Sequence, residues 1–119
     1  MNSANNPQNR RRVPRRAFNK RVGLLVNGVY MVSESTQLGE GGMLIVCPQK
    51  LEIGQKLVVT FKLPDAVQAV VRGIIRYRLE PKGDAKHPCY GIEFINLDFN
   101  LKREIRSFVA SKSQQEEAA

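Results

Sequence analysis

The feature that most constrains the fold is an alternation of apolar and polar residues that recurs in short runs along the chain. The longest run extends from Val67 to Tyr77, where most odd-numbered positions are apolar and the even-numbered positions include Arg72 and Arg76. Because successive side chains of a strand point to opposite faces, only the odd-numbered face can be buried without burying arginine. The other strand-like runs lie within 17–26, 29–32, 43–47, 57–63 and 90–94. The sequence therefore predicts six short strands.

Turn and helix signals complete the predicted architecture. Asn27-Gly28 is typical of a tight hairpin between the first two strands. After Asp98 the apolar period lengthens to that of a helix, and Asp98 or Asn100 would cap its first turn. The apolar stripe of this helix consists of Leu101, Ile105, Phe108 and Val109. We expect a mainly β fold, namely a six-stranded antiparallel barrel with one C-terminal α-helix.

The length and composition of the chain fit a single domain. The chain has 119 residues, of which 42% are hydrophobic, and this is enough for one modest core. Residues 1–9 are mostly polar, so we expect a disordered N-terminal tail that cannot repay the entropy of ordering. The domain is predicted to span 10–112 and to include a basic arm at 10–16. Residues 113–119 are expected to form a frayed tail.

The basic arm carries most of the net charge of the protein. Five arginines lie in 10–16, and residues 1–22 hold seven Lys or Arg and no acidic residue. The rest of the chain holds twelve basic and eleven acidic residues, and the net charge is +8. A local excess of this kind points to an anionic partner that docks at one end of the fold. Arginine can grip phosphate oxygens in pairs and can also stack flat on a purine ring.

A glycine-rich segment is the second candidate part of a binding site. Three glycines in four positions occur within Gln37–Gly42 and predict a loop. Its backbone N–H groups and its lack of side-chain bulk suit a phosphate or a base. If the arm folds across the mouth of the closed sheet where this loop emerges, the two segments form a nucleotide site. Two simpler interpretations stay open: a solvated arm that binds polyanions without specificity, and a glycine segment that is only a turn.

The sequence lacks the groups that an enzyme or a metal site needs. His87 is the only histidine and lies in a polar segment predicted to be a hairpin tip, and no nucleophile, metal-binding or phosphate-loop motif occurs. We therefore expect no enzyme activity, no metal and no cofactor. Cys47 and Cys89 lack metal-ligand spacing and are expected to be reduced thiols. No apolar run can span a membrane and no signal peptide is evident, so we expect a cytoplasmic protein without membrane insertion.

The order of these elements resembles the PilZ domain of bacteria over residues 10 to 110. The R-x-x-x-R arm of that family is matched by Arg11–Arg15, our preferred register, and also by Arg12–Arg16. The late Gly-x-x-Phe strand of the family is matched within Tyr90–Phe94. The resemblance implies a PilZ-like β-barrel that binds the second messenger cyclic di-GMP.

The second motif of the family, D/N-x-S-x-x-G, is altered in this chain. Gln37 stands where the family has Asp or Asn, Gly39 where it has Ser, and Gly42 keeps the final glycine. In the family, the acid or amide meets the guanine edge and the serine helps to hold the ligand. Gln37 still has an accepting amide oxygen, whereas Gly39 has only backbone groups. Losing one neutral hydrogen bond costs about 0.5–1.5 kcal/mol, so we expect weakened rather than abolished binding.

The leading hypothesis is a cyclic di-GMP receptor or adaptor whose arm closes over the ligand and changes the surface presented to an unknown partner protein. Arg11 and Arg15 are expected to grip phosphate and stack on guanine. The full set of expected nucleotide-binding residues is Arg11, Arg12, Arg15, Arg16, Gln37, Gly39 and Gly42. One alternative is a degenerate PilZ-like adaptor that binds a protein and no nucleotide. Another is non-specific nucleic-acid binding by the arm, which the absence of aromatic residues from the basic run disfavours.

Overall fold

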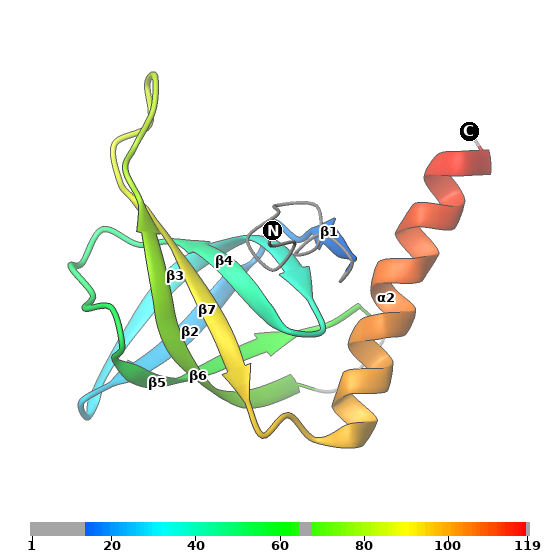
Figure 1. The fold of residues 1–119 in the computed structure, drawn as a ribbon, viewed down its shortest axis with the longest axis horizontal. Helices are drawn as coiled ribbons and strands as arrows, with labels where there is room; N and C mark the ends of the chain where they lie inside the picture. The colour runs from blue at the N-terminus through cyan, green and yellow to red at the C-terminus, as the bar shows by residue number, and fades with distance from the viewer. Residues whose placement is uncertain (1–13, 65–67, 119) are drawn as a thin grey trace, which may run out of the picture.

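The computed structural model of the protein describes residues 14–64 and 68–118. The expected N-terminal tail 1–9 and the first arginines of the basic arm, including Arg11 and Arg12, lie outside the described residues. Within the described residues, seven strands precede the helix α2 (Phe99–Ala118), and Figure 1 shows their arrangement. The strands are β1 (Arg15–Ala17), β2 (Arg21–Val26), β3 (Val29–Gly39), β4 (Gly42–Val46), β5 (Lys56–Lys62), β6 (Gln68–Leu79) and β7 (Cys89–Ile95).

Six of these strands close into an antiparallel barrel. The strands follow the order β3-β2-β5-β6-β7-β4, and β4 pairs back onto β3 to complete the ring. The expected six-stranded antiparallel barrel with a C-terminal helix is therefore confirmed. The additional strand β1 was not expected, because its three residues are too short for an alternation to be visible. It pairs with the end of β3, and Arg15 lies opposite Gly39.

The apolar and polar residues that alternate in the sequence are the alternately buried and exposed residues of the barrel wall. The inward-facing residues of β5, β6 and β7 form much of the core and are Leu57, Val59, Phe61, Ala69, Val71, Ile75, Tyr90, Ile92 and Phe94. Phe61 packs on Phe94 with parallel rings, and Phe18 meets Phe61 edge-on at a centroid distance of 6.0 Å. Burial of these side chains is the main force that holds the strands in this register.

The strand β3 is longer than the sequence predicted. The expected strand ended at Val32, but β3 continues through polar residues to Gly39. The reason is that Ser33 and Ser35 face the interior, where their hydroxyls donate to the main-chain carbonyls of Val46 and Phe18 respectively. A buried hydroxyl is tolerated when it is hydrogen-bonded, so these serines do not end the strand. The expected glycine-rich loop 37–42 is accordingly wrong in extent, since only residues 40–41 form the turn between β3 and β4.

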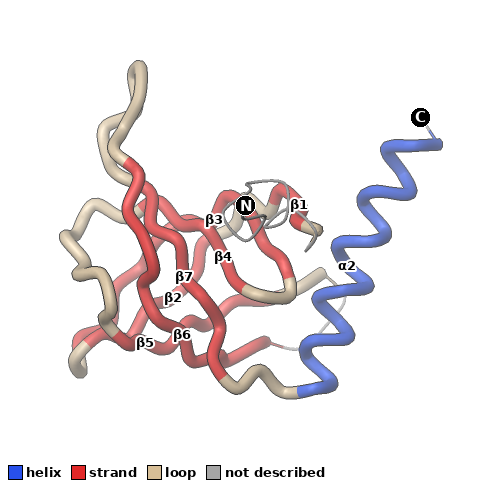
Figure 2. Tube along the Cα trace, viewed as in Figure 1, coloured by secondary structure: helices blue, strands red, loops and turns tan. Residues whose placement is uncertain are grey.

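The helix α2 begins with the predicted cap and packs through the predicted stripe. Asp98 Oδ2 accepts hydrogen bonds from the backbone N–H groups of Asn100 and Leu101, at 3.0 and 3.2 Å. Ile105 and Val109 are buried, and the helix contacts β1 and β3. Beyond this contact its C-terminal turns extend past the barrel (Figure 2). The helix includes all but the last residue of the segment 113–119, whose fraying stays a prediction.

The hairpin of β6 and β7 projects from the opposite side of the barrel (Figure 1). Its tip is the polar segment that the sequence marked as a turn, and residues 80–87 are exposed. His87 is therefore an exposed side chain of the tip.

Candidate ligand-binding site

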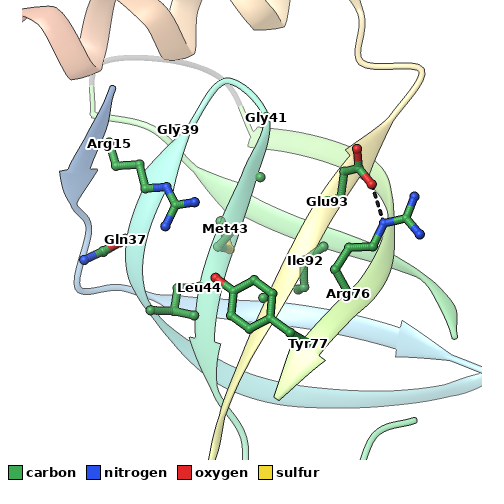
Figure 3. A pocket seen from close by; sticks show the side chains of 12 residues that line it. Arg15, Gln37, Gly39, Gly41, Met43, Leu44, Arg76, Tyr77, Ile92 and Glu93 are labelled. Carbon is green, nitrogen blue, oxygen red and sulfur yellow. Dashed lines mark hydrogen bonds and ion pairs between the residues drawn. The ribbon is translucent and has the colours of Figure 1, made fainter. Parts of the chain in front are cut away.

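A cavity of about 410 Å³ lies beside the barrel wall that is made by β3, β4, β7 and β6 (Figure 3). Most of its lining consists of outward-facing residues. On β7, for example, Glu93 is exposed and lines the cavity, whereas its neighbour Phe94 is buried in the core. The cavity therefore lies on the outer side of the wall, whereas we expected the site at the mouth of the closed sheet.

Four of the seven residues expected to bind the nucleotide line this cavity. They are Arg15, Gln37, Gly39 and Gly42. Pairing of β1 with β3 brings them together, because Arg15 lies opposite Gly39 and Ala17 lies opposite Gln37. The basic arm and the glycine-rich segment, which are distant in the sequence, thus meet at one place, as a shared site requires. Arg11 and Arg12 lie outside the described residues.

Arg16 is the expected site residue that the structure places elsewhere. Adjacent residues of a strand face opposite ways, so Arg16 points toward α2 while Arg15 points toward the cavity. The Arg16 guanidinium lies 3.8 Å from the centroid of the Phe108 ring, and one of its terminal nitrogens donates to the Phe108 carbonyl at 2.8 Å. Arg16 therefore anchors β1 to the helix.

The glycines of the site have different structural roles. At Gly39 an added Cβ would lie 2.8 Å from the carbonyl oxygen of Pro14 and 3.3 Å from Cγ of Arg15, so glycine permits the close approach of β1. At Gly42 an added Cβ would collide with the Ile92 carbonyl, so glycine is needed there for β4 to pack on β7. At Gly41 no atom lies within 4 Å of an added Cβ, which leaves the backbone of the turn open to a ligand.

Several side chains of the cavity were not expected from the sequence. The charged and aromatic ones among them are Arg76 and Tyr77 of β6 and Glu93 of β7. We expected Tyr77 on the buried face of its strand, and this was wrong, because the pairing of β6 with β7 shifts between Ile75 and Tyr77. The irregularity turns the Tyr77 side chain outward, where it is 38% exposed and its ring lies over Gly91. The glycine opposite a tyrosine was the one signal in the sequence that could have indicated this contact.

The two arginines of the cavity differ in whether they form an ion pair. Arg76 forms an ion pair with Glu93, whereas no ion pair of Arg15 is found among the described residues. The guanidinium of Arg15 is thus available to an anion. In Figure 3 Arg15 and Gln37 lie on one side of the cavity, and Arg76 and Glu93 on the other.

The turn beside the cavity is also tied to the helix. Arg106 of α2 donates from Nε to Glu40 Oε2 at 2.9 Å and from a terminal nitrogen to Oε1 at 3.0 Å. This hydrogen bonding holds the pKa of Glu40 below its ordinary value. Because Glu40 lies next to Gly41 and Arg16 lies next to Arg15, α2 contacts both segments that border the cavity.

The described residues offer no other obvious chemistry. No group of three or more His, Cys, Asp or Glu residues with the geometry of a metal site is present among them. Cys47 and Cys89 are unpaired, and burial raises the pKa of the Cys47 thiol. No helix in the described part of the chain is long and apolar enough to cross a membrane.

The protein is a closed barrel, and an open cavity lies between the outer side of the barrel wall and Arg15 of β1. These features are those of a small binding module. The PilZ domain model matches residues 9–111, and the chain therefore belongs to the PilZ domain family. PilZ domains are binding and receptor modules. No curated protein matches the chain.

The fold is also that of several solved structures. The Bacillus subtilis inhibitor of motility (MotI/DgrA) superposes with a TM-score of 0.80 at 13% identity, over 88% of this chain and 52% of that protein. The PilZ domain of YcgR from Escherichia coli, solved with c-di-GMP, gives a TM-score of 0.71 at 16% identity over 92% of this chain and 97% of the domain. YcgR from Escherichia coli in complex with c-di-GMP gives 0.69 at 15% identity over 92% and 48%. The chain thus spans about half the length of the Bacillus subtilis protein.

Proposed function

We propose that this protein is a cyclic di-GMP receptor module that transmits binding of the nucleotide to a partner protein. The observation that carries the proposal is the pairing of Arg15 with Gly39, which puts the second arginine of R-x-x-x-R and the altered D/N-x-S-x-x-G segment at one cavity. Membership of the PilZ domain family and the fold shared with the c-di-GMP complex of YcgR support the same ligand.

The lining of the cavity suits a compact compound with phosphates and purines. Arg15 offers a planar fork of donors for phosphate and a flat face for a base. Tyr77 offers a ring on which a second base can stack. The volume of about 410 Å³ lies in the range of small-molecule sites, which is roughly 300–1,000 Å³.

The orientation of Arg15 favours one register of the arginine motif. Arg15 borders the cavity and Arg16 does not, so we infer that the working pair is Arg11 and Arg15. Arg12 would add positive charge. Bound phosphate neutralises the mutual repulsion of these guanidinium groups and holds the basic arm over the ligand.

Coupling to a partner would pass through α2. Arg16 and Glu40 hold the helix against the two segments that a ligand would contact. A ligand that moves or stiffens either segment therefore changes the contacts that position α2. The affinity of a partner that binds α2 would change as a result.

Calorimetric titration of the purified protein with cyclic di-GMP, with GTP as the control ligand, tests the proposal. We expect binding of cyclic di-GMP alone, and at least tenfold weaker binding by Arg15→Ala. Arg72→Ala is the matched control, because Arg72 is an exposed arginine that does not line the cavity. Equal affinities of wild type and Arg15→Ala would remove the proposed role of that residue.

A second candidate function is a PilZ-type adaptor that binds a protein and no nucleotide. Gly39 favours it, since the place of the family's serine is taken by close contact with the Pro14 carbonyl and no hydroxyl is available there. Absence of heat and of chemical-shift change with cyclic di-GMP at high micromolar concentration would support the adaptor and overturn the receptor.

A further inference from the structure

The carboxamide and carboxylate side chains of the cavity lie on opposite sides of it. Among its described lining residues, only Gln37 and Glu93 carry a carboxamide or carboxylate oxygen. Gln37 lies beside Arg15, and Glu93 lies beside Arg76 on the opposite side, as Figure 3 shows. A ligand that fills the cavity therefore meets a carboxamide on one side and a carboxylate on the other.

The backbone of Glu93 is held more firmly than that of a loop residue. Its strand, β7, is paired on both sides, and Glu93 lies opposite Gly42 of β4 and opposite Ile74 of β6. The Arg76 Nε–H donates to Oε1 of Glu93, and no partner of Oε2 is present among the described residues. About half of each side chain is exposed, 55% for Arg76 and 53% for Glu93, so the pair can rearrange at little cost when a ligand enters.

A carboxylate at this position fits guanine better than any other base. The Watson–Crick edge of guanine presents two adjacent donors, N1–H and the N2 amino group, and a carboxylate presents two acceptors at matching spacing. Adenine presents one donor and one acceptor on the same edge, so its N1 lone pair would face a carboxylate oxygen. A site built to accept two hydrogen bonds rejects a ligand that cannot donate them.

We propose that Glu93 reads a guanine base of the ligand and supplies the carboxylate that position 37 of this chain lacks. Arg76 pairs with the Glu93 carboxylate before the ligand enters, and this exposed pair rearranges when guanine binds. The selectivity of the site for guanine is thereby located on β7, across the cavity from the two family motifs. This inference rests on the proposed binding of cyclic di-GMP.

The test compares cyclic di-GMP, cyclic di-AMP and cyclic di-IMP, which lacks the N2 amino group, by calorimetric titration of wild type and Glu93→Gln. We expect wild type to prefer cyclic di-GMP over cyclic di-AMP, and Glu93→Gln to reduce that preference at least tenfold. Removing the N2 amino group should weaken binding to wild type about fivefold or more and should weaken binding to Glu93→Gln less, because the Gln amide offers only one acceptor to the two guanine donors.

Two control variants separate base reading from loss of the ion pair. Glu52→Gln removes an exposed carboxylate that does not line the cavity and should leave all three affinities unchanged. Arg76→Gln breaks the ion pair but keeps the carboxylate, and should retain most of the preference for cyclic di-GMP.

The possible failures are distinguishable. If wild type binds cyclic di-GMP and Glu93→Gln keeps the same preference over cyclic di-AMP, the role of Glu93 is overturned and the proposed function stands. If Arg76→Gln loses the preference and Glu93→Gln does not, the assignment is likewise overturned. If wild type binds none of the three ligands, the proposed function fails and the inference fails with it.

Discussion

Arg106 of α2 makes two hydrogen bonds to Glu40 in the turn between β3 and β4, at 2.9 and 3.0 Å. Glu40 is followed by Gly41, which lines the cavity. This pair of side chains therefore joins the helix to the turn that borders the cavity. A ligand that contacts the turn acts on one end of this pair, and anything that moves α2 acts on the other.

The first prediction concerns the motion of this turn. Replacing Arg106 by Gln removes the charge-assisted hydrogen bonds and should increase amide hydrogen exchange at Glu40 and Gly41 several-fold. Hydrogen exchange followed by NMR measures it. Arg103→Gln is the control, because Arg103 is an exposed arginine of the same helix without an ion pair to a described residue. Unchanged exchange in Arg106→Gln would mean that the turn is held by its backbone alone.

The free energy of unfolding should depend on pH through the ionisation of Glu40. Its pKa is lowered from an ordinary value of 4.5 by the Arg106 hydrogen bond, so the carboxylate stabilises the fold fully above pH 4.5 and less as the pH falls through its lowered pKa. Wild type should therefore exceed Glu40→Gln in free energy of unfolding at pH 7, and the difference should shrink below about pH 4.5. Urea denaturation at several pH values measures this. In an Arg106→Gln background the difference should nearly vanish, and its persistence there would contradict the assignment.

Arg15 and Arg16 should separate binding from stability. Arg16→Ala removes a cation–π contact and a hydrogen bond to the Phe108 carbonyl, and should lower the free energy of unfolding by about 1–3 kcal/mol. Arg15→Ala should leave stability nearly unchanged and weaken binding of cyclic di-GMP. Urea denaturation and calorimetric titration of both variants provide the comparison. The same effect of both substitutions on stability would show that the two arginines do not face opposite ways.

Neighbouring glycines of the turn should differ in their tolerance of a methyl group. Gly42→Ala places Cβ against the Ile92 carbonyl, and should destabilise the protein by about 1–3 kcal/mol or more, the cost of overpacking. Gly41→Ala is the matched control, since no atom lies within 4 Å of the added carbon. Thermal unfolding of the two variants distinguishes them. Equal melting temperatures would place β4 farther from β7 than the structure does.

Restoring the family's serine should not restore tighter binding. In Gly39→Ser the new Cβ would lie 2.8 Å from the Pro14 carbonyl oxygen, so β1 must move away from β3 and carry Arg15 with it. We expect weaker binding of cyclic di-GMP in a calorimetric titration, whereas Gln37→Asn, which shortens an exposed side chain, should keep or improve it. A gain in affinity from Gly39→Ser would indicate that β1 has room to shift.

The sequence predicted those parts of the fold that burial alone determines. The alternation up to Ile75 and the stripe through Ile105 and Val109 predicted the barrel wall and the helix, because apolar side chains can be buried in only one register. The sequence did not predict that Ser33 and Ser35 continue a strand, because the carbonyls that satisfy their hydroxyls come from distant segments.

Only part of the lining of the candidate site was predicted from the sequence. The arginine and glycine motifs led to Arg15, Gln37, Gly39 and Gly42, which do line one cavity. Other lining residues come from β6 and β7, where an irregular register turns Tyr77 outward. Such an irregularity adds one residue to a strand and leaves no mark in an alternation, so only the paired strands reveal it.

The pairing of β1 with β3 involves three residues on each strand and begins with two identical side chains, Arg15 and Arg16. A register shift of one residue between β1 and β3 would exchange the directions of the two side chains. Arg15 would then point toward α2, and Arg16 toward the cavity. Neither the charge nor the size of the two side chains can prevent this exchange. Because Gly39 has no Cβ, Pro14 and Arg15 can approach its backbone closely. Gly39 thus favours the register in which Arg15, and not Arg16, faces the cavity.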